Sequence, residues 1–157
     1  MAHHDDLLAH AFALVHTQPQ SETILRRAVS AAYCAVFHLL IFEATEHWDN
    51  SGLRSTLGRA YDHGLMRTTS NRILDQREFP YANEDPRVVK ELREIALGFI
   101  ELQQERHFAD YNLTKILGPL DALGQVRAAE KIFLALPAIK TEQIVQEYLT
   151  LLLVKKR

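Results

Sequence analysis

The sequence predicts an all-α fold, namely an antiparallel helical bundle of four to five core helices with an additional C-terminal helix. Apolar residues recur at helical spacing through most of the chain. No segment alternates apolar and polar residues for long enough to predict a sheet. Clusters of Gly, Pro, Ser and Asn separate the periodic segments. The length of 157 residues suits one domain. We therefore expect a single domain over residues 1–157, with a core of about 5–113 and C-terminal helices over about 120–155.

The first half of the chain predicts three helices. The first covers about Asp5–His16, and the second starts after Ser21, a common helix N-cap, and extends to about His47. Between Ala28 and Phe42 the second helix is apolar on nearly every side, which is typical of a helix surrounded by others. A third helix is expected over about Leu53–Met66, with these residues facing inward: Leu57, Ala60, Tyr61 and Leu65.

The middle of the chain predicts a long loop and then a long helix. Residues 68–85 lack periodicity, so we expect a loop with at most one helical turn, and loops of this length are often functional. Asp85 and Pro86 suit the N-cap and the first position of a fourth helix. This helix is expected to continue to about Tyr111.

Two further helices are expected in the C-terminal part. The fifth covers about Leu120–Leu136 and is expected to end at Pro137, because proline removes a backbone donor and clashes with the preceding turn. The sixth covers about Thr141–Leu153, with an acidic residue in its first turn.

Charge and cysteine content restrict the function and the compartment. The net charge of −2 gives no bulk attraction to nucleic acid or membranes, so such binding would need a local patch. Cys34 is the one cysteine, which excludes an internal disulfide and favours a reducing compartment. The apolar run from Ala28 to Phe42 is shorter than the roughly 20 residues of a membrane span. The first residues lack the basic segment of a signal peptide. We expect a cytoplasmic protein that does not enter a membrane.

The inward face of the fourth helix carries two charged residues. Its apolar stripe contains, in order, Val88, Leu92, Ile95, Phe99 and Leu102. Arg106 and Asp110 continue this stripe with the same spacing, while His107 lies at its edge. A charge on an inward face costs several kcal/mol unless it is paired. Arg106 and Asp110 therefore form either an internal salt bridge, since they are four residues apart, or part of a functional site.

A matching stripe lies on the second helix. Arg27, Ala31, Cys34 and His38 follow one face, and Tyr33 lies on the neighbouring face. Taken alone, His38 fits a hydrogen-bonded core histidine, and Cys34 fits a small buried apolar residue. With the fourth helix opposite, the same positions also fit a polar cluster between two helices.

Two segments together resemble a known superfamily. The second helix contains RRAVSAAYCAVFHLL (26–40), and the fourth ends in ERHFADYN (105–112). This pair resembles the HEPN domain superfamily, more narrowly a bacterial HEPN-like branch with the motifs R-R-A-V-S-x-A-Y-x-A-x-F-H and R-x-x-A-D-Y. The resemblance covers about Ser21 to Leu113. Cys34 stands where that branch commonly has a second tyrosine.

The resemblance implies a helical bundle that often dimerises. In many HEPN proteins, arginine motifs from two copies meet and cleave RNA without a metal: the ribose 2′-hydroxyl attacks its phosphodiester, an arginine stabilises the charge and a histidine moves protons. Arg106 matches this arginine, and His107 matches the polar residue after it. The histidine that ends the active motif is missing, since the positions that could hold it are occupied by Tyr111, Asn112 and Leu113.

Three functions follow as alternatives. The first is a weakly catalytic or non-catalytic HEPN-like protein that binds a nucleotide, RNA or a partner protein. The second is a metal-independent RNase of a toxin–antitoxin or defence system, with a homodimeric site and an antitoxin-like protein partner. The third is a purely structural polar core, with protein interaction at the surface. No cofactor and no metal ligands are expected. The candidate catalytic residues are Arg106, His107 and His38, and the candidate binding cluster contains Arg27, Tyr33, Asp110, Tyr111 and Asn112.

Overall fold

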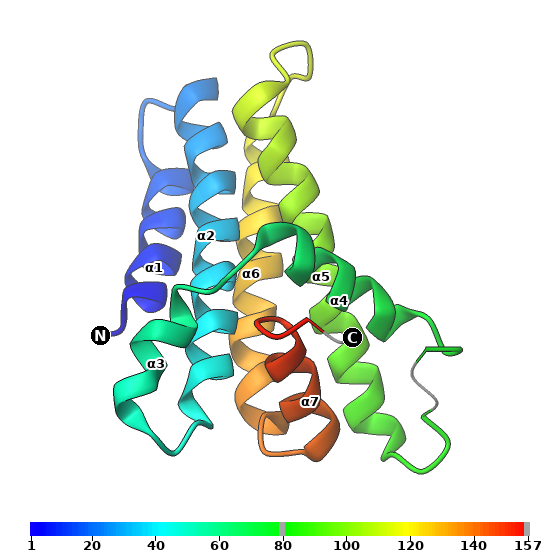
Figure 1. Cartoon of the computed structure of the whole chain (residues 1–157). Coiled ribbons are helices and arrows are strands. Elements are labelled where there is room, and N and C mark those ends of the chain that lie inside the picture. Colours follow the sequence, from blue (N-terminus) through cyan, green and yellow to red (C-terminus); the bar gives the residue numbers. More distant parts are fainter. Residues whose placement is uncertain (79–80, 156–157) are drawn as a thin grey trace. The chain divides into compact units, whose positions relative to one another are not determined.

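A computed structural model describes residues 1–78 and 81–155, and helices make up most of this part of the chain. Phe79 and Pro80, which belong to the predicted loop, lie outside the described residues, as do Lys156 and Arg157. No strand occurs within the described ranges, so the predicted all-α fold is confirmed. The helices are α1 (His3–His16), α2 (Glu22–Glu46), α3 (Ser51–Gly58), α4 (His63–Leu74), α5 (Pro86–Tyr111), α6 (Pro119–Ile139) and α7 (Gln143–Leu151) (Figure 1).

The two longest helices begin where the sequence predicts. The Ser21 hydroxyl oxygen accepts a hydrogen bond from the backbone N–H of Ile24 at 3.2 Å, which caps α2. The Asp85 carboxylate accepts the N–H of Arg87 at 2.9 Å and caps α5. Both caps satisfy donors that the first helical turn leaves free.

The predicted third helix is wrong, because the segment forms two helices. The carboxylate of Asp62 accepts the N–H of Leu65 at 2.7 Å, and this N-cap starts α4 instead of allowing α3 to continue. Ala60 and Tyr61, predicted to face inward, are exposed in the connection between the helices. The sequence Asp62-His63-Gly64 indicates a helix N-cap, but the apolar periodicity across it favoured one continuous helix.

The predicted loop is shorter than expected, because α4 extends to Leu74. Its inward face combines Met66 and Ile73 with the buried hydroxyl residues Thr69 and Ser70, which masks the helical period of apolar residues. Each hydroxyl has a partner, as buried polar groups require. The Thr69 hydroxyl donates to the carbonyl oxygen of Leu151 at 2.9 Å. The connection before α5 is therefore residues 75–85.

Pro137 does not end the fifth predicted helix. It lies inside α6, two residues before its end. Leu136 and Ile139 are both buried on either side of it. The burial of two large side chains offsets the one hydrogen bond that proline removes in the last turn.

The contacts divide the chain into two compact units. Unit 1 consists of Met1–Leu39 and Glu101–Phe133, and unit 2 consists of Leu40–Ile100 and Leu134–Arg157. In unit 1, α1 contacts α6 through Phe12, whose ring lies 5.4 Å from the Arg127 guanidinium. In unit 2, α4 packs on α7, where Ser70 and the buried Tyr148 share a hydroxyl–hydroxyl hydrogen bond of 2.8 Å. The single-domain prediction stays a prediction.

Helix α2 also resembles a membrane span in composition. It contains 25 residues, with a mean hydropathy of 1.6 over its most apolar window. The whole helix is therefore long enough to span a membrane, although the apolar run from Ala28 to Phe42 alone is too short. However, 78% of the most apolar window of α2 is buried inside the protein. Such burial is expected of the core helix of a bundle.

Candidate functional site

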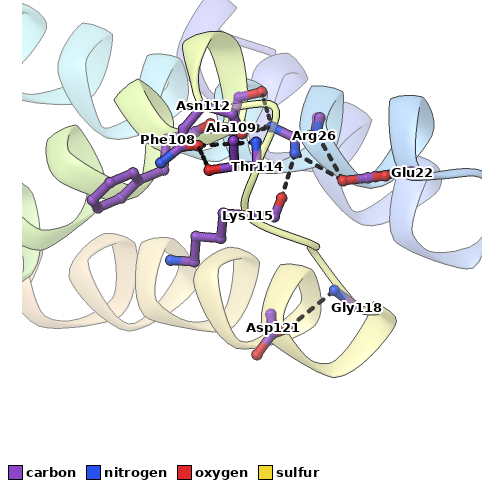
Figure 2. Close-up of polar contacts among 9 residues, drawn as sticks. All are labelled: Glu22, Arg26, Phe108, Ala109, Asn112, Thr114, Lys115, Gly118 and Asp121. Atoms are coloured by element: carbon purple, nitrogen blue, oxygen red, sulfur yellow. Dashed lines mark hydrogen bonds and ion pairs between the residues drawn. The ribbon is translucent and has the colours of Figure 1, made fainter.

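Arg26 on α2 donates hydrogen bonds to several backbone carbonyls of unit 1. Its Nη1 donates to the backbone carbonyl oxygens of Phe108 at 3.1 Å, Ala109 at 2.9 Å and Asn112 at 3.0 Å (Figure 2). Its Nη2 donates to the carbonyl oxygen of Lys115, and Glu22 pairs with the same guanidinium at 2.8 Å. The guanidinium therefore joins α2 to the end of α5 and to the segment that follows it.

The Arg26 guanidinium provides donors for carbonyl oxygens at the C-terminal end of α5. The last carbonyls of an α-helix have no partner within the helix, and a cation near them is favoured by the helix dipole. Arg26 supplies the planar fork of donors for this purpose, and only 13% of its side chain is exposed. Arg26 was not among the residues predicted for the site; the need to satisfy the carbonyl oxygens at the end of α5 is the signal that could have identified it.

The segment after α5 folds back on the helix. The Asn112 side-chain oxygen accepts the N–H and hydroxyl of Thr114 at 3.1 and 2.7 Å, which forms a tight turn. Asp121 accepts the N–H of Gly118 at 3.0 Å at the start of α6 (Figure 2). Asn112, a predicted member of the binding cluster, thus has a structural role through both its side chain and its carbonyl.

Arg106 and Asp110 form the predicted salt bridge, with 2.8 Å between Nε and Oδ2. The Nε–H does not point at an acceptor well enough for a hydrogen bond, so the contact is an ion pair only. Asp110 also accepts from the Ser30 hydroxyl at 3.4 Å. The Arg106 guanidinium lies 5.5 Å from the ring centre of Tyr33, a cation–π distance. The side chains of Arg106 and Asp110 remain 33% and 22% exposed.

The Arg106–Asp110 pair affects the pKa values of two groups on α2, the buried Tyr33 and the half-buried Cys34. Burial raises the pKa of Tyr33 to about 12, against opposing effects of a hydrogen bond to Gln103 and of Arg106. Burial also raises the pKa of the Cys34 thiol, which Arg106 lowers and Asp110 raises. Tyr33 is 1% exposed, so this predicted binding residue is part of the core and acts as the surface on which Arg106 rests. Neither group is an activated nucleophile.

A shallow pocket adjoins the ion pair. It has a volume of about 380 Å³ and includes Arg27, Asp110, Tyr111 and Leu113 in its lining. Arg27 is exposed and has no ion pair or hydrogen bond to any residue of the ranges 1–78 and 81–155. Tyr111 is 65% exposed, and its ring centre lies 5.2 Å from that of His107, which is also exposed. We call Arg27, Arg106, His107, Asp110 and Tyr111 the Arg27 surface.

His38 has different neighbours. Its ring lies 5.0 Å from the ring of His3 and 5.2 Å from that of Phe37, both in edge-on geometry. It is five residues beyond Tyr33, which is about 7.5 Å along the helix axis. The structure thus gathers five of the eight predicted site residues on one surface, places Tyr33 beneath it, uses Asn112 in a turn, and puts His38 in an aromatic cluster.

Comparisons with protein-family models, curated proteins and solved structures found no match to this chain. Within the described residues, no group of three or more His, Cys, Asp or Glu side chains is placed to hold a metal ion.

Cys34 provides a natural reporter of the Arg106–Asp110 pair. We expect the native thiol to react with iodoacetamide more slowly than the unfolded thiol, because only the thiolate reacts and burial raises its pKa. Arg106→Gln should move the pH midpoint of the reaction upward, and Asp110→Asn should move it downward. Mass spectrometry of labelling between pH 7 and 10 measures both midpoints. Equal midpoints in the two variants would show that the pair does not act on Cys34.

Proposed function

We propose that this protein binds single-stranded RNA through the Arg27 surface without cleaving it. The observation that carries the proposal is the contrast between adjacent arginines. Arg26 is occupied by backbone carbonyls and Glu22, whereas Arg27, the next residue, is exposed and has no partner among the described residues. An unpaired guanidinium beside a partly exposed ion pair is suited to receive a phosphate.

The two arginines of the Arg27 surface suit the phosphates of an RNA backbone. Arg27 can bind one phosphate directly. Arg106 keeps one third of its side chain exposed and can bind a second phosphate while it remains beside Asp110. Because Asp110 neutralises part of this charge, we expect binding in the micromolar range, with few counterions released.

The exposed rings of His107 and Tyr111 favour single-stranded RNA over a duplex as the ligand. Bases in single strands stack on exposed aromatic rings, at about 1–3 kcal/mol per base. Tyr111 projects its ring from the last turn of α5, and His107 lies one turn earlier on the same side. Guanidinium groups for phosphates and rings for bases thus occur within one surface.

The placement of the histidines supports binding without cleavage. The residue that corresponds to the last histidine of the active HEPN motif is Tyr111, Asn112 or Leu113. His107 faces Tyr111, and His38 contacts the rings of His3 and Phe37. Proton transfer to or from a bound ribose would need a histidine opposite Arg106. The HEPN resemblance and a cytoplasmic location are part of this proposal.

Fluorescence polarisation with a labelled 12-nucleotide RNA tests the binding. With two phosphate contacts, the logarithm of the affinity should fall with the logarithm of salt at a slope of about −1.4, and Arg27→Gln should reduce that slope to about −0.7. Tyr111→Ala should weaken binding by about 5- to 100-fold, while Tyr111→Phe keeps it.

Arg59→Gln is the matched control, because Arg59 is an exposed arginine of unit 2. It should leave affinity and slope unchanged. Loss of binding in this variant, or no saturable binding by the wild type, would contradict the proposal. Cleavage in EDTA that leaves 2′,3′-cyclic phosphate ends and disappears in Arg106→Ala would instead establish an RNase.

We also propose that the protein forms a homodimer through an apolar surface next to this site. Leu113, Ile116 and Leu120 are 85%, 84% and 83% exposed, in one stretch between α5 and the start of α6. Covering a side chain of this size contributes about 1.5–3 kcal/mol. A symmetric contact here would bring two Arg27 surfaces close together.

Light scattering measures the mass of the assembly. For the wild type we expect twice the mass of one chain. For the double variant Ile116→Ser, Leu120→Ser we expect the mass of one chain, with unchanged helix content. Both residues are exposed, so the fold should tolerate the change. A monomeric wild type, or a variant that stays dimeric, would rule out this surface as the interface.

A further inference from the structure

A second pocket lies in unit 2. It has a volume of about 670 Å³, within the range typical of small-molecule sites. One wall is the first half of α5, and the opposite wall is formed by the end of α4 and described residues of the 75–85 connection. Figure 1 shows this connection between α4 and α5.

The walls of this pocket are fixed by hydrogen bonds. The Tyr81 hydroxyl donates to the carbonyl oxygen of Ile73 at the end of α4. Arg93 on α5 donates to the carbonyl oxygen of Leu74 at 3.4 Å. The N–H of Glu84 donates to the carbonyl oxygen of Tyr81 at 3.1 Å, which forms a turn before α5. The connection is thus tied to both helices, and the pocket is a feature of the folded unit.

Most of the lining is apolar. Leu74, Ala82, Pro86, Val89 and Leu97 contribute to it. Leu97 is 44% exposed, which leaves apolar surface uncovered on α5. Such a lining favours a ligand with a hydrocarbon body, because water is displaced from both surfaces when the ligand binds.

Two cations on α5 provide the polar part of the pocket. Lys90 and Arg93 are three residues apart, so they lie on the same side of the helix. Neither forms an ion pair with a carboxylate in the part of the chain that the structure describes. Two lining residues are acidic, but Glu94 has a polar contact of its own, and Glu84 is exposed to solvent.

We propose that this pocket binds a small organic anion, namely a carboxylate with an aliphatic or aromatic body. The carboxylate pairs with Lys90 and Arg93, and the body lies on the apolar walls formed by Val89 and Leu97. Two donors from neighbouring turns suit the two oxygens of one carboxylate. This site shares no residue with the Arg27 surface, so it stands or fails independently of RNA binding.

Binding of 1-anilinonaphthalene-8-sulfonate, followed by its fluorescence, tests the site, with decanoate and decylammonium as competitors. The wild type should bind the dye saturably, and decanoate should displace it whereas decylammonium should not. Lys90→Gln should weaken both the dye and decanoate by about tenfold, because one charge-assisted hydrogen bond is lost. Lys90 is exposed, so this variant should fold normally. Arg93→Gln provides a second, independent variant.

Two controls locate the effect. Glu84→Gln removes a lining carboxylate and should leave decanoate binding equal or tighter. Ile116→Ser reduces the exposed apolar surface of unit 1 and should leave dye binding unchanged. The proposal is overturned by any of three results: no saturable binding, equal competition by decylammonium, or unchanged affinity in both Lys90→Gln and Arg93→Gln.

Discussion

The hydrogen bonds from Arg26 to the carbonyl oxygens at the end of α5 are the contact on which the arrangement of unit 1 depends. They reach carbonyl oxygens both in the last turn of α5 and in the residues after it, and they tie α2 to the segment that leads into α6. Without this cation, the carbonyl oxygen of Phe108 would keep the N–H of Asn112 as its donor, whereas that of Ala109 would depend on water. Arg106 and Tyr111 both belong to the last two turns of α5, so their positions depend on the same contact.

Three arginines near one another thus differ in their surroundings. Arg26 is nearly buried and has only structural partners, and Arg106 is shared between Asp110 and solvent. Arg27 is exposed and has no partner in the described ranges 1–78 and 81–155. Burial of a guanidinium is favourable only when its donors are satisfied, which the backbone achieves for Arg26. A cation in contact with water keeps its ability to exchange partners. The structure therefore distinguishes a guanidinium whose donors hold the fold, that of Arg26, from two that remain in contact with solvent.

The sequence predicted the all-α fold and the inward stripe of α5 because apolar spacing is a strong local signal: Leu92, Ile95, Phe99 and Leu102 are all buried. It also predicted the Arg106–Asp110 pair from their four-residue separation. It did not predict the α3–α4 break or the length of α4, because an N-cap and buried hydroxyls with distant partners decide these features. Arg26 was missed for the same reason, since its acceptors lie more than 80 residues away in the chain.

Thermal unfolding of three matched variants, Arg26→Gln, Arg27→Gln and Arg106→Gln, tests this division most directly. Loss of the Arg26 contacts should cost about 2–3 kcal/mol and lower the melting temperature by about 5–10 °C. Arg106→Gln should cost about 1 kcal/mol or less, since the pair is partly exposed, and Arg27→Gln should change nothing measurable. If Arg106→Gln lowers the melting temperature as much as Arg26→Gln, the Arg106–Asp110 pair is a structural lock and the account is contradicted.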